Sequence, residues 1–289
     1  MTDPNQSAGR GGPTDDPAGH IHDREKAAGA RAGTQSLTID SPRAAIEVDD
    51  VGWTVGGAVI LAEISVKIGK GELLAVIGPN GAGKSTLVNM ISGVSTPSTG
   101  RILLDGRDVT KLPVRLRARA GIGRTFQTSS LFGGLTSLQN VCFALQSATS
   151  SPLNPLRRAV NPAILEEGRA LLDRVGMGSR ATWSTAALSH GDKRKLELAV
   201  AMARRPEVLL LDEPMAGVSM EDVPGLVRLI ADLNQQGVTV CMVEHHMHVV
   251  LGLADRIAVL HHGRLLAVGS PSEVMADQTV KRAYLGDAL

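Results

Sequence analysis

The stretch GPNGAGKST, residues 78–86, has the residue types and the spacing of a phosphate-binding loop. Its glycines let successive backbone N–H groups turn towards phosphate oxygens, and a helix predicted just after it points its positive end at the same place. Lys84 is suited to neutralise the β and γ phosphates, and Ser85 offers a hydroxyl to Mg²⁺. A glycine-rich turn without a ligand is the alternative, but the buried strand predicted before the loop favours a nucleotide triphosphate. The predicted nucleotide-binding residues are Gly78, Pro79, Asn80, Gly81, Ala82, Gly83, Lys84, Ser85 and Thr86.

Two acids follow a second buried run, VLLL at residues 208–211. Asp212 is suited to hold the Mg²⁺ shell through water, and Glu213 to polarise an attacking water. Either acid alone would be better explained as the exposed end of a strand. Together with the loop, the pair favours phosphoryl transfer to water over nucleotide storage.

His245 comes just after a third buried run, VTVCMV at residues 238–243. Ligands of parallel sheets bind at the carboxyl ends of the strands, so we expect His245 at the same edge as the loop. A neutral imidazole there is able to contact the γ-phosphate and the water; a structural histidine is an equal alternative on spacing alone. Gln127, in GIGRTFQ, is by itself only a glutamine in a loop.

The stretch LSHGD, residues 188–192, begins a predicted helix. Ser189 is suited to cap it, and Asp192, three residues later, completes a capping-box pattern. Gly191 is unfavourable inside a first turn but permits close approach of backbone to a ligand. The pattern therefore predicts a helix end that attracts an anion, although the chain already has one phosphate-binding loop.

The elements that position these residues alternate between strands and helices, which predicts an α/β fold. ISVKI, residues 64–68, alternates apolar and polar residues as in an antiparallel strand with one wet face, whereas LLAVI, residues 73–77, is apolar throughout and predicts a strand covered on both faces. Between about 130 and 188 we expect mostly helix, with Asn161 and Pro162 starting one helix and Gly176 ending it.

Composition excludes some functions. The 289 residues carry a net charge of +1 and 2% aromatic residues, so nucleic acid is not the predicted partner. We find neither an apolar run long enough to span a membrane nor a secretory signal. Cys142 and Cys241 lie in apolar surroundings, which favours buried thiols in a reducing cytoplasm. The composition of residues 1–44 predicts a disordered tail. We expect His20 and His22 in this tail to be solvated rather than to bind a metal.

With GPNGAGKST, GRTFQ, LSHGD, VLLLDEP and VEHHM in this order, residues 45–289 resemble the ATP-binding subunit of an ATP-binding cassette (ABC) transporter. The resemblance implies an ABC nucleotide-binding domain: a RecA-like P-loop core with an antiparallel β subdomain and a helical subdomain at about 130–188. It implies ATP and Mg²⁺ as cofactors, Gln127 as a glutamine that senses the metal and the membrane partner, and His245 as the switch histidine. In a head-to-tail dimer, Ser189, His190 and Gly191 would close over the ATP of a second ABC ATPase subunit.

The chain also resembles, more narrowly, the importers of branched-chain amino acids. The segments that carry this resemblance are GIGRTFQ, EPMAG, VEHHM and the ending VGSPSEV through AYLG. Importers of urea and short-chain amides are close relatives, so the solute stays open. The resemblance implies two permease subunits, an extracytoplasmic solute-binding protein, and a peripheral location at the cytoplasmic face of the inner membrane. A soluble ABC ATPase is the rival, but it should show tandem cassettes, a long coiled-coil insert or a basic face.

The chain departs from the family's pattern at several positions. Val55 stands where the family has an aromatic residue that stacks on adenine. Trp53, two residues earlier on the same strand face, is the predicted substitute, and a core position for Trp53 is the alternative. Ser219 stands where the family has aspartate, which puts communication between the two ATP sites in doubt. His246 likewise replaces an aspartate, and LSHGD replaces LSGGQ. None of these changes removes a predicted hydrolytic group.

Overall fold

The computed structural model describes residues 44–125, 131–149 and 161–285. All of them fall in the second of the chain's two units, Asp40–Leu289. In these ranges no helix is both long enough and apolar enough to cross a membrane.

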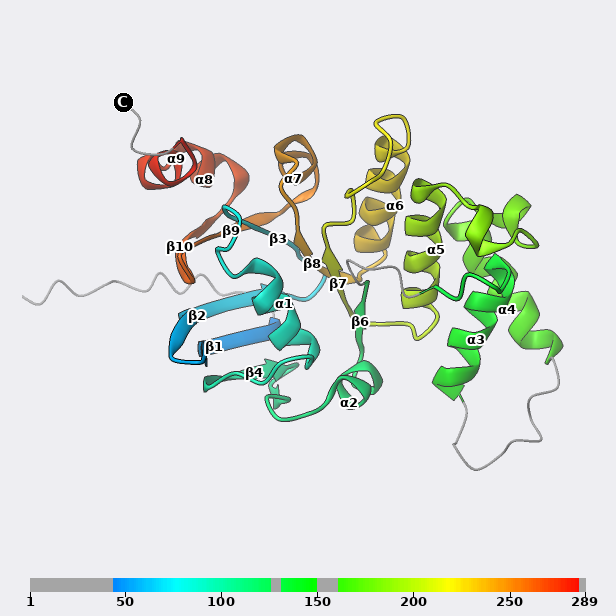
Figure 1. The fold of residues 1–289 in the computed structure, drawn as a ribbon, viewed down its shortest axis with the longest axis horizontal. Helices are drawn as coiled ribbons and strands as arrows, with labels where there is room; N and C mark the ends of the chain where they lie inside the picture. Colours follow the sequence, from blue (N-terminus) through cyan, green and yellow to red (C-terminus); the bar gives the residue numbers. More distant parts are fainter. Residues whose placement is uncertain (1–43, 126–130, 150–160, 286–289) are drawn as a thin grey trace, which may run out of the picture. The chain divides into compact units, whose positions relative to one another are not determined.

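A largely parallel sheet carries the predicted buried strands (Figure 1). Among the described residues its strands run in the order β10-β9-β3-β8-β7-β6, and β10 alone is antiparallel to its neighbour. Every residue of β3, β7 and β8 is buried, as continuously apolar runs predict. The bounds are β3 Leu73–Ile77, β6 Ile122–Arg124, β7 Val208–Asp212, β8 Thr239–Val243, β9 Arg256–His261 and β10 Arg264–Gly269.

The two faces of this sheet are covered by different elements. Along β7, Val208 and Leu210 join one hydrophobic cluster and Leu209 and Leu211 another, because successive strand side chains point to opposite faces. The first cluster includes α1 (Lys84–Ser92) and the antiparallel sheet. The second includes α5 (His190–Met202) and α6 (Val223–Gln235). A third, smaller cluster packs α7 (Met247–Leu253), α8 (Pro271–Ala276) and α9 (Gln278–Leu285) against β3 and β9.

An antiparallel sheet of order β2-β1-β4-β5 lies beside α1. The alternation predicted from ISVKI is confirmed, since Ile64, Val66 and Ile68 are buried while Ser65 and Lys67 are exposed. The strands β4 and β5, and the short strand β6 of the other sheet, were not predicted. The bounds are β1 Ala44–Val55, β2 Ala58–Gly69, β4 Thr99–Leu104 and β5 Arg107–Asp108.

Helices dominate the described residues between 131 and 188, as predicted. Helix α3 (Ser137–Thr149) and helix α4 (Pro162–Arg174) pack against one another and against α5 (Figure 1). The predicted cap of α4 is confirmed, because the Asn161 side chain accepts a hydrogen bond from the Ala163 N–H at 3.0 Å. Gly176, with φ of 70°, follows its end. A further helix, α2 (Val114–Arg119), precedes β6.

Candidate nucleotide-binding site

The glycines of the loop between β3 and α1 meet two physical requirements. A Cβ atom on Gly78 would lie 2.2 Å from the Leu260 carbonyl oxygen, and one on Gly83 would lie 2.4 Å from a methyl carbon of Leu61. Gly83 also has a φ of 99°, which side chains disfavour. Close packing and backbone conformation therefore both require glycine at these positions of the predicted motif.

Helix α1 begins directly after the loop, and no side chain caps its N-terminus. Gly83 caps the helix without a side-chain hydrogen bond, and its first turn contains no acid. The first N–H groups of a helix lack partners within the helix, so this end suits an anion. Lys84 bends back over the loop, where its Nζ donates to the carbonyls of Gly78 at 2.8 Å and Pro79 at 3.0 Å. Burial lowers the pKa of Lys84, against the opposing effect of the Glu213 and Asp212 carboxylates.

Oxygen ligands suited to Mg²⁺ meet at the carboxyl ends of β3 and β7. The Ser85 hydroxyl donates to Asp212 Oδ1 at 3.2 Å, and Asp212 is 2% exposed. A hydroxyl beside a carboxylate is the type of oxygen pair that hard cations prefer. Arg124, at the end of β6, binds the other carboxylate oxygen at 3.3 Å. We assigned no role to Arg124 from the sequence, although it lies within the GRTFQ motif.

A cavity of about 310 Å³ joins the loop to Glu213. Glu213 follows β7 with a φ of 49°, and its N–H donates to the Val243 carbonyl at 2.9 Å, which ties the ends of β7 and β8 together. The predicted base is therefore in the same cavity as Lys84 and Ser85. The cavity is lined by Ile60, Asn80, Gly81, Ala82, Gly83, Lys84, Ser85, Thr86 and Glu213.

His245 occupies the predicted edge, because β8 lies between β3 and β7. Its side chain is 56% exposed and is not part of the cavity lining. The preceding residue, Glu244, is fully buried and contacts His245, His246 and Met215. No role for this glutamate was predicted from the sequence, although its place between a buried strand and a candidate histidine was a signal for one.

The remaining predicted residues of the nucleotide site differ in their placement. Trp53 is half-buried and packs against the hydrophobic cluster of the antiparallel sheet, whereas Ile60 of β2 lines the cavity. The pairing of β1 with β2 is irregular around Trp53. Stacking of Trp53 on adenine stays a prediction. Gln127 lies outside the described residues.

The LSHGD segment begins α5, as predicted, and it does not line the cavity. Ser189 Oγ accepts from the Asp192 N–H at 3.1 Å, but the capping box is only half formed, because the Asp192 carboxylate binds Arg180 at 2.7 Å instead. Ser189 and His190 are exposed. At Gly191 a Cβ atom would lie 2.7 Å from Asp222 Oδ2, so a neighbouring side chain of this chain also explains the glycine.

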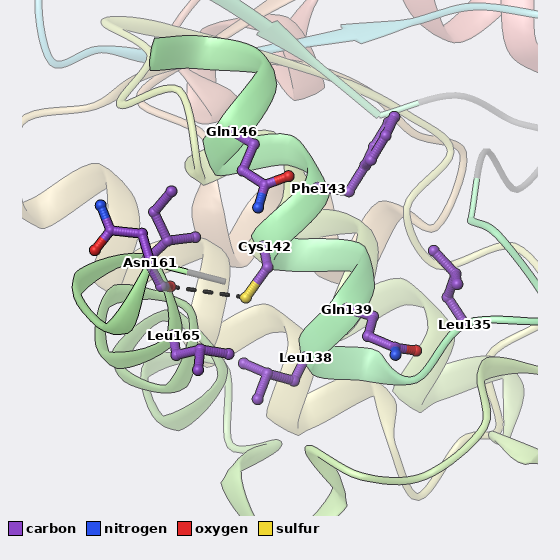
Figure 2. Close-up of a pocket in the computed structure, with 9 residues that line it drawn as sticks. Leu135, Leu138, Gln139, Cys142, Phe143, Gln146, Asn161 and Leu165 are labelled. Carbon is purple, nitrogen blue, oxygen red and sulfur yellow. Dashed lines mark hydrogen bonds between the residues drawn. The ribbon is translucent and has the colours of Figure 1, made fainter. Parts of the chain in front are cut away.

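A second cavity, of about 260 Å³, lies between α3 and the start of α4 (Figure 2). Leucines and Phe143 line much of it, and Cys142 points towards α4, where its Sγ is 3.7 Å from the Ile164 carbonyl oxygen. Burial raises the pKa of this thiol, and it raises the pKa of Cys241 to about 12. Both cysteines are buried and unpaired, as predicted.

The parallel sheet, the glycine loop and the acids at neighbouring strand ends define a P-loop nucleotide-binding protein. The family model described as ABC transporter matches residues 61–216, and the one described as branched-chain amino acid ATP-binding cassette transporter matches residues 264–289. The chain belongs to the ABC transporter family as one of its ATP-binding cassettes. Its nucleotide is therefore ATP, and its activity is ATP hydrolysis coupled to transport.

Similar proteins support the same assignment. The chain is 37% identical to the high-affinity branched-chain amino acid transport ATP-binding protein LivG of Salmonella typhimurium, over 81% of this chain and 94% of that one. It is also 37% identical to the lipopolysaccharide export system ATP-binding protein LptB of Acidithiobacillus ferridurans, over 79% and 91%. A crystal structure of a nucleotide-free ATP-binding cassette from an ABC transporter covers 84% of this chain and 100% of its own, with a TM-score of 0.76 and 26% identity.

Proposed function

We propose that this chain hydrolyses ATP, with Mg²⁺, to drive import of branched-chain amino acids through partner permeases. The observation that carries the hydrolytic part is the placement of Glu213 in one cavity with Lys84 and Ser85. The solute is supported by the match of residues 264–289 and by the name of LivG.

The residues divide the work of hydrolysis. The backbone N–H groups of the loop and Lys84 hold the β and γ phosphates, and Glu213 orients and polarises the attacking water. His245 contacts the γ-phosphate from the end of β8. Ser85, Asp212 (through water) and Gln127 would hold a Mg²⁺ ion, which would supply positive charge to offset that of the phosphates.

A second ABC ATPase subunit completes the site in this proposal. Ser189, His190 and Gly191 lie at the start of α5, away from the cavity of their own chain. A helix start with an exposed serine suits a phosphate supplied by another subunit. We assign these residues to the ATP bound by that partner, in a head-to-tail dimer.

The domain at residues 44–289 would sit peripherally on the cytoplasmic face of the membrane, beneath two permease subunits, with a solute-binding protein on the other side. The helical subdomain at about 130–188 offers exposed aromatic side chains to a partner: Phe132 and Phe143 are 50% and 53% exposed, and their rings meet edge to face at 5.1 Å. Apolar rings left in water favour a protein contact. We propose residues 1–43 as a tail outside this domain, one residue shorter than the sequence predicts, because Ala44 belongs to β1.

Two other transport roles are the alternatives. Urea or short-chain amide import follows from the narrower resemblance, and lipopolysaccharide export is the printed role of LptB. Uptake assays with the purified complex in lipid vesicles separate the import of amino acids from the import of urea or amides. ATP-dependent leucine uptake supports the proposal, whereas uptake of urea or acetamide without leucine would replace it.

Glu213→Gln tests the proposed base. Glutamine keeps the size of the side chain but loses the carboxylate that accepts a proton, so we expect ATP binding to persist while kcat falls by about a hundredfold or more. ATP affinity is measured by calorimetry and phosphate release by a coupled assay on the assembled complex. Hydrolysis near the wild-type rate would refute the assignment of Glu213.

A further inference from the structure

Glu244 is a buried carboxylate to which the proposed hydrolysis gives no task. It directly follows β8, precedes His245, and is 0% exposed. Burying an ionised carboxylate is unfavourable unless hydrogen bonds compensate, so its partners indicate why it is there.

Those partners lie on two different loops. Glu244 Oε1 accepts a hydrogen bond from the Met215 N–H at 3.1 Å. Its Oε2 accepts from the N–H groups of His245 at 2.7 Å and His246 at 3.0 Å, and contacts the His246 ring Nδ1 at 2.8 Å. Met215 comes two residues after Glu213, so one carboxylate joins the loop of the candidate base to the loop of the candidate switch histidine.

The contact with the ring of His246 has a defined donor. Burial alone would raise the pKa of Glu244, but the hydrogen bonds from His246, His245 and Met215 hold that pKa below its usual range. An ionised carboxylate only accepts, so Nδ1 of His246 carries the proton. The His246 ring, fixed in this way, lies against the His245 ring with 4.2 Å between centroids and 35° between planes.

We propose that Glu244 is a positioning residue for ATP hydrolysis, which holds His246 and, through its ring, orients His245 relative to the loop of Glu213. This inference rests on the proposed function, because it needs His245 to act on ATP. His246 suits the task, since its ring N–H donates to Glu244. The aspartate usual in the family at this position would place a second carboxylate beside the buried one.

A metal site is the competing explanation for the same residues. Ligand atoms of Glu244, His245 and His246 all lie within 4.8 Å of one another. However, Glu244 Oε2 already accepts three hydrogen bonds, two of them from backbone groups. A metal ion at this oxygen would have to displace the His246 donor, so the positioning role fits the observed bonds better.

The test compares kinetic constants of full-length variants in the assembled complex. We expect Glu244→Gln and His246→Ala to lower kcat about tenfold or more while KM for ATP stays within about twofold, because the nucleotide contacts are intact and only orientation is lost. His246→Asn, whose amide is able to donate to Glu244, should recover part of the rate. His248→Ala, an exposed histidine nearby, is the matched control and should behave as wild type.

A double-variant cycle separates positioning from general structural damage. In a His245→Ala background, Glu244→Gln should lower kcat by no more than about twofold, because the residue it orients is gone. A full tenfold loss in that background, or a wild-type kcat for His246→Ala, would overturn the inference. His246 is 36% exposed, so its alanine variant keeps the test valid if Glu244→Gln fails to fold.

The outcomes for the two proposals are distinct. A wild-type complex that fails to hydrolyse ATP would remove the proposed function, and equal hydrolysis by wild type and Glu213→Gln would remove the assignment of Glu213 as the base. A different set of results would remove only the positioning role: wild type hydrolyses ATP normally, Glu213→Gln loses hydrolysis, and the Glu244 and His246 variants are unchanged. Zinc titration of the wild-type chain provides a further control: stoichiometric binding lost in His246→Ala, with unchanged kcat, would favour the metal site.

Discussion

At the scale of single residues, Lys84 is a buried lysine held by its own phosphate-binding loop. The Lys84 ammonium donates to two carbonyl oxygens of its own loop, and the nearby acids partly offset the effect of burial on its pKa. These bonds use two of the three donors of the ammonium group, and both acceptors are neutral carbonyl oxygens. A triphosphate would supply anionic acceptors, so the lysine is poised to exchange loop carbonyls for phosphate oxygens.

Lys84→Ala should weaken ATP binding strongly without unfolding the protein. Charge-assisted hydrogen bonds contribute about 1.5–3 kcal/mol, so we expect the dissociation constant to rise by about tenfold to a hundredfold. Calorimetry measures the affinity, and thermal unfolding without nucleotide serves as the control. An unchanged dissociation constant would contradict the role of Lys84.

At the scale of one element, the start of α5 combines a cap with a candidate binding surface. Ser189 bonds the Asp192 N–H, while the Asp192 carboxylate is held by Arg180, whose guanidinium lies 5.6 Å from the centre of the Trp183 ring. The Asp192 side chain is thus engaged away from the serine. The exposed face of the helix start is left to Ser189 and His190.

Two variants of Ser189 separate its structural role from its proposed contact with ATP. Ser189→Ala removes the cap and should lower the free energy of unfolding by about 1 kcal/mol, whereas Ser189→Asp keeps a good cap. Both should lower hydrolysis by the complex, because alanine removes the hydroxyl and aspartate repels the γ-phosphate. Chemical denaturation and phosphate release measure the two effects; full activity in Ser189→Asp would argue against the partner contact.

At the scale of the whole molecule, the chain offers three separate surfaces: the ATP cavity, the start of α5, and the exposed aromatic side chains of the helical segment. Phe143 of the third surface is drawn in Figure 2. A cassette working alone would need only the first. The separation of these three surfaces fits the proposal that the subunit contacts a second ATPase and a permease at once.

Phe143→Ser tests the proposed permease contact. The side chain is 53% exposed but packs edge to face against Phe132, so we expect the free energy of unfolding to fall by only about 1 kcal/mol, with a clear loss of co-purifying permease. Met275→Ser, on α8, exchanges another exposed apolar side chain and should leave co-purification unchanged. Equal recovery of permease with both variants would exclude Phe143 from the contact.

The sequence by itself determined the motif, the strands beside it and the helix starts, because these depend on nearby residues. The run LLAVI, the glycines of residues 78–83 and the caps at Asn161 and Ser189 each act over a few positions. The short strand β6 was not predicted, because three residues carry too little pattern.

Only the tertiary structure decided which side chains meet across the sheet. Arg124 reaches Asp212, Asp192 turns to Arg180 rather than completing its capping box, and Ile60 instead of Trp53 lines the cavity. Glu244 joins two loops whose residues are 29 positions apart in the sequence. Such contacts depend on strand order and register, which bring distant residues together and leave no periodic signal in the chain.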